Sequence, residues 1–168
     1  TGDETQLQQG DQRLRGKLVD VPVLGELLAE QGLNLATLSS GTPGGARMLN
    51  HKAESLGNFR FALHRPDASL PRETVLEMQK QLGPVPEHQI PSLDWLTYST
   101  NAYLNFIEPE LHPDVFILWF CEPDNSYHFR GLGSPENLEA LHQADLEFGR
   151  ILDWHRSRKK EDALQIIT

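Results

Sequence analysis

The sequence predicts an α/β fold with three layers, α/β/α, built around a mostly parallel sheet. Residues 115–120, VFILWF, form a continuously apolar run, which is typical of a parallel strand covered on both faces. Candidate strands at 33–40 and 59–63 alternate with helix patterns along the chain, and such alternation favours a parallel sheet with helices on both faces. The length of 168 residues suits one domain or one large piece of a bigger α/β domain.

The first elements in chain order are a polar lead-in, a helix and a strand. Residues 1–19 are polar and weakly patterned, so we expect a helix end or a disordered lead-in. Residues 22–31 have a helical period, and Gly32 suits the position that ends a helix. Residues 33–40 predict a short strand, followed at 41–51 by a glycine-rich turn and a short helix. The apolar stripe of the first helix consists of Leu24, Leu27 and Leu28.

The middle of the chain predicts a strand and two helices. Residues 59–63 alternate weakly, as a strand does, and residues 72–83 have a helical period. A proline-rich connector at 83–91 makes helix unfavourable there. Ser92 is then the expected N-cap of a long helix that Pro109 ends.

The last third predicts a strand, a loop and a long helix. The strand at 115–120 runs into a polar loop at 124–133. Ser134 is the expected N-cap of a helix over 135–156. Residues 164–168, LQIIT, predict one more strand. The expected core stripe of the long helix consists of Leu138, Leu141, Ala144, Phe148 and Leu152.

Composition excludes several classes of protein. The formal net charge is −9, and an acidic chain without a basic stripe does not suit a nucleic-acid groove or an anionic membrane surface. No apolar stretch reaches the roughly 18 residues that a membrane-spanning helix needs. Cys121 is the single cysteine, so an intramolecular disulfide is excluded and an inert thiol is the favoured interpretation.

The candidate site is the stretch EPDNSYH, residues 122–128, directly after the strand at 115–120. Ligands bind beyond the carboxyl ends of strands in open parallel sheets. Asp124 and His128 offer a carboxylate oxygen and an imidazole nitrogen, both of which are ligands for zinc and similar ions. On spacing alone, an Asp-stabilised turn beside a surface histidine is the alternative. Glu122 is either a residue that orients a ligand or a plain loop carboxylate, and Asn125 and Tyr127 are candidates for substrate contact.

The residues around this stretch extend the pattern. The apolar strand runs into Pro123-Asp124 and His128, a P-D-x-x-x-H motif, and a glycine-rich segment follows. The next helix has the pattern AD…G…LD. This arrangement resembles the type I phosphodiesterase/nucleotide pyrophosphatase branch of the alkaline phosphatase superfamily. Residues 21–51 also resemble the segment of that family in which a helix and a strand lead to a glycine-rich turn.

The resemblance implies a metal-dependent hydrolase of phosphate esters that acts on a small phosphate ester or a nucleotide. Such a site holds two divalent metal ions, usually zinc: one binds water or the leaving oxygen, and the other activates a Thr or Ser nucleophile. Asp124 and His128 match two ligands of one ion. In the family, the nucleophile precedes the matched part and the other ligands follow it. The resemblance therefore implies that residues 1–168 are an incomplete, central part of an alkaline-phosphatase-like catalytic domain. No catalytic residue is identified, and the chain alone is expected to be inactive.

The alternative is a non-catalytic α/β binding or structural module with a degenerate metal site. Thr42 matches the later glycine-rich turn and not the nucleophile, and GTPGG favours a structural turn because it lacks the P-loop motif. Arg47 is expected to be solvated. The six histidines other than His128 have no shared spacing and are expected at the surface: His51, His64, His88, His112, His142 and His155. An incomplete sheet exposes strand edges, so we also expect self-association.

Overall fold

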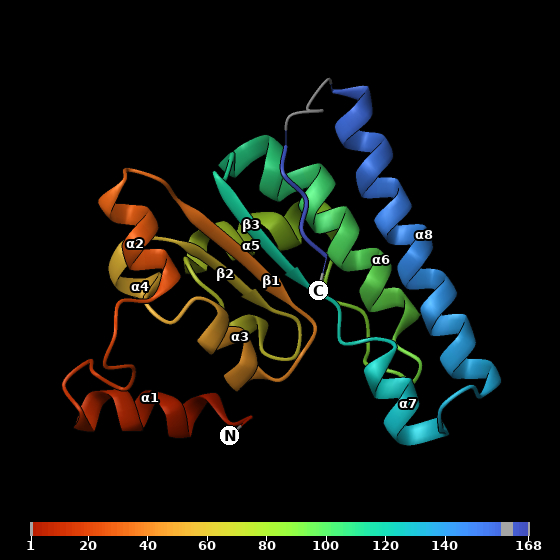
Figure 1. Ribbon diagram of the computed structural model, residues 1–168, viewed down its shortest axis with the longest axis horizontal. Helices are drawn as coiled ribbons and strands as arrows, with labels where there is room; N and C mark the ends of the chain where they lie inside the picture. Colours follow the sequence, from red (N-terminus) through yellow and green to blue (C-terminus); the bar gives the residue numbers. More distant parts are fainter. Residues whose placement is uncertain (1, 159–162, 168) are drawn as a thin grey trace.

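The sheet has three strands, all parallel, in the order β2-β1-β3. The computed structural model describes residues 2–158 and 163–167. The strands are β1 (Leu35–Ser39), β2 (Phe59–Ala62) and β3 (Val115–Trp119). Helices cover both faces of the sheet (Figure 1), which confirms the predicted three-layer α/β/α class.

The two faces of the sheet differ in chemistry. On one face, Phe59, Ala36 and Phe116 form a row across the strands, and Phe61, Leu38 and Leu118 form the next row. These side chains belong to the main hydrophobic core or pack against it. The helices that bury this face are α5 (Arg72–Leu82), α6 (Leu93–Ala102), the π-helix η2 (Tyr103–Leu111) and α8 (Pro135–Ser157).

The other face carries polar residues and packs against α3 (Pro43–Leu49). Its central row is Arg60, Thr37 and Ile117. Arg60 and Thr37 are both buried, although each is polar. Burial of polar side chains is costly unless they find partners, so this face needs groups from outside the sheet.

The lead-in contains a helix, one of the two predicted alternatives. Helix α1 (Glu4–Arg13) begins at the N-cap Asp3, whose carboxylate accepts hydrogen bonds from the backbone amides of Thr5 and Gln6. It packs on α3 (Figure 1). The helix therefore covers part of the polar face of the sheet.

Helix α2 (Leu24–Glu30) confirms the helix predicted at 22–31, and Gly32 follows it with a φ of 72°. Its buried residue is Gly25, and α2 packs against α4 (Ala53–Leu56). Leu24 and Leu27 are nearly half exposed. A Cβ at Gly25 would lie 3.3 Å from the Leu56 side chain of α4, so the glycine makes room for this contact, and Leu24 and Leu27 do not form it.

Two predictions for the middle of the chain need correction. Ser92 is the N-cap residue of α6, as predicted, but its hydroxyl donates to the Gln89 carbonyl oxygen (2.6 Å) and makes no capping hydrogen bond to the helix. The helical segment also continues through Pro109 to Leu111 as the π-helix η2. A proline ring clashes with the carbonyl four residues earlier in an α-helix, whereas a π-helix pairs residues five apart. The predicted strand at 59–63 and helix at 72–83 are confirmed.

The strand at 115–120 exists as β3, but it lies at an edge of the sheet and not in its middle. Its residues are half-buried, and Trp119 is exposed. The buried central strand is β1, whose five residues are all buried. Apolar character thus predicted the strand correctly but overestimated its burial.

The helix predicted at 135–156 and its cap are confirmed, because the Ser134 hydroxyl accepts from the Asn137 amide (3.1 Å). The predicted core stripe is only partly right: Ala144, Phe148 and Leu152 are half-buried. The residues that α8 buries are Asn137, Ala140, Glu147 and Ile151. Leu138 and Leu141 are more than half exposed. Small and polar side chains on the buried face bring α8 close to α6, where Glu147 accepts from the Thr97 hydroxyl (2.8 Å).

Two further segments differ from the prediction. Residues 124–133 are not a loop throughout, because α7 (Asp124–Arg130) forms there. Residues 164–167 of the predicted last strand are irregular, and Leu164, Ile166 and Ile167 are 72–85 % exposed. Without burial of these side chains, little offsets the entropy cost of ordering a strand. Thr168 lies outside the described residues. Within the described ranges, no helix has the length and apolar character needed to span a membrane.

Candidate metal-binding site

Helix α7 starts immediately beyond the carboxyl end of β3, and buried Glu122 fixes its first turn. One oxygen of the Glu122 carboxylate accepts from the Ser92 amide (2.8 Å), and the other accepts from the Ser126 amide (2.9 Å). The carboxylate thus joins the start of α6 to the start of α7. These contacts place Glu122 beneath the helix that carries the candidate ligands.

Asp124 and His128 lie one helical turn apart on α7, a spacing that puts both side chains on the same face. His128 Nε2 is 3.4 Å from Asp124 Oδ1. The His128 side chain is 64 % exposed, and the Asp124 side chain is 67 % exposed. The structure therefore brings the predicted pair together on an accessible surface.

The separation of the two atoms suits a shared metal ion. Zinc–oxygen and zinc–nitrogen distances of about 2.0–2.2 Å with tetrahedral angles give a ligand–ligand separation of about 3.3–3.6 Å. The observed 3.4 Å falls within that range. Histidines one turn apart bind zinc on helices by the same geometric principle.

The other residues of the stretch have distinct roles. The Cys121 thiol donates to Asn125 Oδ1 (3.4 Å), which leaves Asn125 turned toward the strand end. Tyr127 is exposed, and its ring centroid lies 5.1 Å from that of His128. Burial, followed by the charges of Asp124 and Glu122, raises the pKa of the Cys121 thiol. A raised pKa disfavours the thiolate, in agreement with the expected inert cysteine.

Two histidines that lie far apart in the sequence meet beyond β2. The rings of His64 and His88 are 5.1 Å apart, and each lies 4.6 Å from the ring of Trp95. Burial, and then the neighbouring His88, lowers the pKa of His64. Sequence spacing gave no signal for this cluster, because the proline-rich connector brings His88 back to the strand end.

The remaining sequence candidates are mostly structural. The Thr42 hydroxyl accepts from the Gly45 amide (3.2 Å) and caps α3, as expected for a structural turn. Arg47 and His51, by contrast, were expected at the surface and are buried. Both lie under α1, and their carboxylate neighbours Glu4 and Asp11 are about 40 residues earlier. Local patterns do not contain that information.

His155 also departs from the expected surface position. It is half-buried, and its Nε2 lies 2.9 Å from the Tyr103 hydroxyl. Burial lowers the pKa of His155. The residue therefore belongs to the packing of α8 against η2.

Metal-ligand chemistry at α7 is limited to the pair itself. Within residues 2–158 and 163–167, no group of three or more His, Cys, Asp or Glu side chains is arranged to hold a metal ion. Two concave surfaces lie elsewhere, one at the amino ends of the strands beside Asn34 and Pro113 and one beside Lys17 and Lys52. Comparisons with protein-family models, with curated proteins and with solved structures found no match.

Proposed function

We propose that this chain supplies Asp124 and His128 as two ligands of one metal ion in a phosphoric ester hydrolase of the phosphodiesterase/nucleotide pyrophosphatase kind. The observation that carries the proposal is the 3.4 Å separation of Asp124 Oδ1 and His128 Nε2 on an exposed helix beyond a strand end. The resemblance of residues 113–153 to that family supplies the reaction class.

The chemistry follows from the donor set. Asp124 supplies a charged oxygen and His128 a neutral imidazole nitrogen, which suit zinc or a similar divalent ion. Two protein ligands leave coordination positions open for water and for a phosphoryl oxygen. Since no nucleophile is assigned among these residues, we expect the chain to bind metal and phosphate without turnover.

Zinc binding measured by calorimetry tests the proposal. We expect weak binding to one site, because two ligands are fewer than the roughly three or four of a complete zinc site. His128→Ala and Asp124→Asn remove a ligand and should each weaken binding by more than the roughly tenfold that loss of an orienting neighbour costs. His142→Ala, which removes another exposed histidine, serves as the matched control. Equal zinc binding by the wild type and His128→Ala would reject the proposal.

A second measurement tests the reaction class. Open positions on the metal predict that AMP binds to the zinc-loaded chain and binds less well after chelation of the zinc. The His128→Ala variant should lose this zinc-dependent binding. AMP affinity that is the same with and without zinc would argue against a phosphoesterase site.

The alternative function is a non-catalytic α/β binding or structural module. One observation favours it: Asp124 Oδ1 and His128 Nε2 already lie 3.4 Å apart, as neighbouring side chains one turn apart on an ordinary helix surface do. The module predicts that the wild type, His128→Ala and His142→Ala all bind zinc with the same low affinity. The zinc titration therefore distinguishes the two functions.

A further inference from the structure

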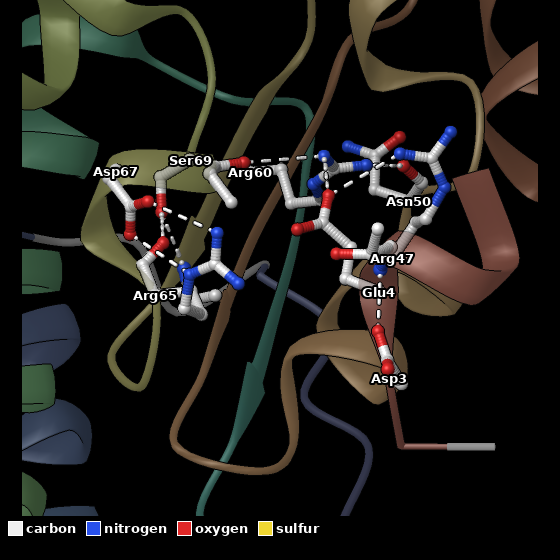
Figure 2. Close-up of polar contacts among 11 residues, drawn as sticks. Asp3, Glu4, Arg47, Asn50, Arg60, Arg65, Asp67 and Ser69 are labelled. Carbon is white, nitrogen blue, oxygen red and sulfur yellow. Dashed lines mark hydrogen bonds and ion pairs between the residues drawn. The ribbon is translucent and has the colours of Figure 1, made fainter. Parts of the chain in front are cut away.

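Two buried arginines share one carboxylate on the polar face of the sheet. The Arg47 side chain, from α3, is 9 % exposed, and the Arg60 side chain, from β2, is 4 % exposed. Figure 2 shows the Glu4 carboxylate of α1 between the two guanidinium groups. One negative charge thus faces two positive charges in a place shielded from water.

Glu4 fits the two guanidinium groups loosely. A single oxygen, Oε1, lies 3.4 Å from Arg47 Nη1 and 3.4 Å from Arg60 Nη2. Hydrogen bonds between charged groups are normally shorter, at about 2.7–2.9 Å. Burial, and then repulsion from Arg47, lowers the pKa of Arg60, while Glu4 and Glu54 raise it. The geometry and the charge both indicate that the arginines can accept a better anion.

Other unsatisfied groups gather beside the arginines. Within the described residues, seven buried side-chain atoms have no hydrogen-bond partner, and five of them belong to residues of this region. Thr37 is the cross-strand neighbour of Arg60, and Asn50 and His51 follow Arg47. The five atoms are Thr37 Oγ1, Arg47 Nε, Asn50 Oδ1, His51 Nδ1 and His51 Nε2. Of these, His51 Nε2 lies 3.4 Å from the Asp11 carboxylate, at a distance typical of an ion pair and long for a hydrogen bond. Unpaired buried polar atoms are rare in folded proteins. This region therefore has more hydrogen-bonding groups than its internal contacts satisfy.

The element that closes the region is held mainly by polar contacts. All of α1 lies within the described residues, none of its residues is buried, and its one large apolar side chain, Leu7, is half-buried. Glu4 and Asp11 are seven residues apart, so they share one face of the helix. Asp11 Oδ1 lies 3.4 Å from His51 Nε2, which repeats the acid-on-base contact two turns along. The start of α1 can therefore dissociate from the sheet when another anion replaces the Glu4 carboxylate between the arginines.

We propose that Arg47 and Arg60 form a binding site for an oxyanion, the phosphate or carboxylate group of a ligand, which Glu4 occupies as an internal ligand in this structure. A tetrahedral phosphate offers each guanidinium its own oxygens, and guanidinium groups bind such oxygens in pairs. Binding requires displacement of the start of α1. The site shares no residue with the Asp124/His128 pair, so the two proposals stand independently.

The first experiment titrates inorganic phosphate, and separately acetate, into chelator-treated, metal-free chain by calorimetry. Glu4→Gln removes the internal charge and should raise the phosphate affinity by about fivefold or more, the lower range of typical coupling between sites. Glu77→Gln, an exposed glutamate on α5, has the same charge change and should leave the affinity unchanged. Adding Arg47→Gln to Glu4→Gln should abolish the gain.

The outcomes are distinct. Binding of phosphate and acetate supports a general oxyanion site, and binding of phosphate alone identifies a phosphoryl ligand. A phosphate affinity of Glu4→Gln equal to that of the wild type, with circular dichroism showing a folded protein, would overturn the proposal.

The second experiment uses the wild type and does not depend on a stable variant. Arg13 ends α1, Arg15 and Lys17 follow it, and all three have exposed side chains. Release of α1 should make the backbone at these residues accessible to trypsin. Inorganic phosphate should therefore accelerate cleavage at these residues relative to sodium chloride of the same ionic strength. Arg47→Gln should remove the acceleration. Equal cleavage rates in phosphate and chloride would contradict the displacement of α1.

Discussion

The α1/α3 end and the α7 end of this molecule differ in whether their charged side chains are buried. Where α1 and α3 cover the sheet, Arg47, Arg60 and most of Glu4 are removed from water. On α7, the Asp124/His128 pair is two-thirds exposed, and the nearby Phe129 and Leu132 are exposed as well. Charges are thus buried at the α1/α3 end, while apolar side chains face solvent at the α7 end.

The two ends differ in how much their charged groups contribute to stability and in how easily those groups can bind a ligand. A buried ion pair that loses one partner leaves an uncompensated charge, which is strongly destabilising. An exposed pair contributes little to stability, so its members can exchange each other for a metal ion at low cost. We therefore expect substitutions of the buried charges beneath α1 to reduce the free energy of unfolding strongly, and substitutions on α7 to affect metal binding with little effect on folding.

The largest effect is expected for Arg60→Ala. The change leaves the largely buried Glu4 carboxylate with one cationic partner fewer and removes the donors to the Asn50 and Ala68 carbonyl oxygens. We expect a loss of about 3–5 kcal/mol in the free energy of unfolding, measured by urea denaturation. His128→Ala is the control and should change it by less than about 0.5 kcal/mol. Similar losses in the two variants would remove the contrast between the two ends.

Glu122→Gln tests whether the α7 end has one buried charge that matters. The amide keeps one acceptor oxygen but places its NH2 group against the other backbone amide, of Ser92 or Ser126. Since hydrogen bonds to charged groups contribute about 1.5–3 kcal/mol, we expect a loss in that range by urea denaturation. Hydrogen exchange in α7 should accelerate. Glu136→Gln, at a partly exposed ion pair with a distance of 4.0 Å, should have almost no effect.

Acid should weaken the α1 end through His51. Burial lowers the pKa of His51, Asp11 raises it, and Lys52 and Arg47 lower it further. A histidine with a lowered pKa binds fewer protons in the folded state, so stability is lost as the pH falls below about 6.5, the value for the unfolded chain. His64 and His155 shift in the same direction.

Melting temperatures between pH 7.5 and pH 5.5 measure this loss. His51→Gln should reduce the pH dependence, and His142→Gln, at an exposed position on α8, should leave it as in the wild type. Asp11 acts in a lower window: burial raises its pKa, but the Leu18 amide and the charges of His51 and Lys52 lower it overall. Its contribution is present above about pH 3.9 and is lost below it. A melting temperature that rises on acidification from pH 7.5 would contradict the assignment.

The smallest effect on folding, but a visible effect on association, is expected for Leu141→Glu. Leu138 and Leu141 are 56 % and 54 % exposed on α8, and β3 has a strand neighbour on one side only among the described residues. Exposed apolar surface and open strand edges favour self-association. Light scattering after size exclusion should show a wild-type mass that rises with concentration and a smaller rise for Leu141→Glu. Leu76→Glu, at a half-exposed leucine of α5, is the control. A wild-type monomer at all concentrations would refute the prediction.

The sequence by itself determined the α/β class and most of the segments that form regular structure. Ser134 followed by Pro135 predicts the start of α8 because both residues act within the first turn of a helix. The apolar run at 115–120 predicts β3 for a similarly local reason. The Asp124/His128 contact also depends on a local feature, the turn of α7, although the sequence predicted a loop there. That helix depends in part on Glu122, which accepts from Ser92 thirty residues earlier.

Only the tertiary structure decided which side of each element is buried. The leucine stripe of α8 has the helical period, yet Ala140 and Ile151 face the core because α6 lies on that side. Arg60 is buried in the middle of β2 because Glu4, 56 residues away in the chain, reaches it from α1. Helical and strand periods are properties of a short segment, whereas burial and charge compensation depend on which distant segments meet.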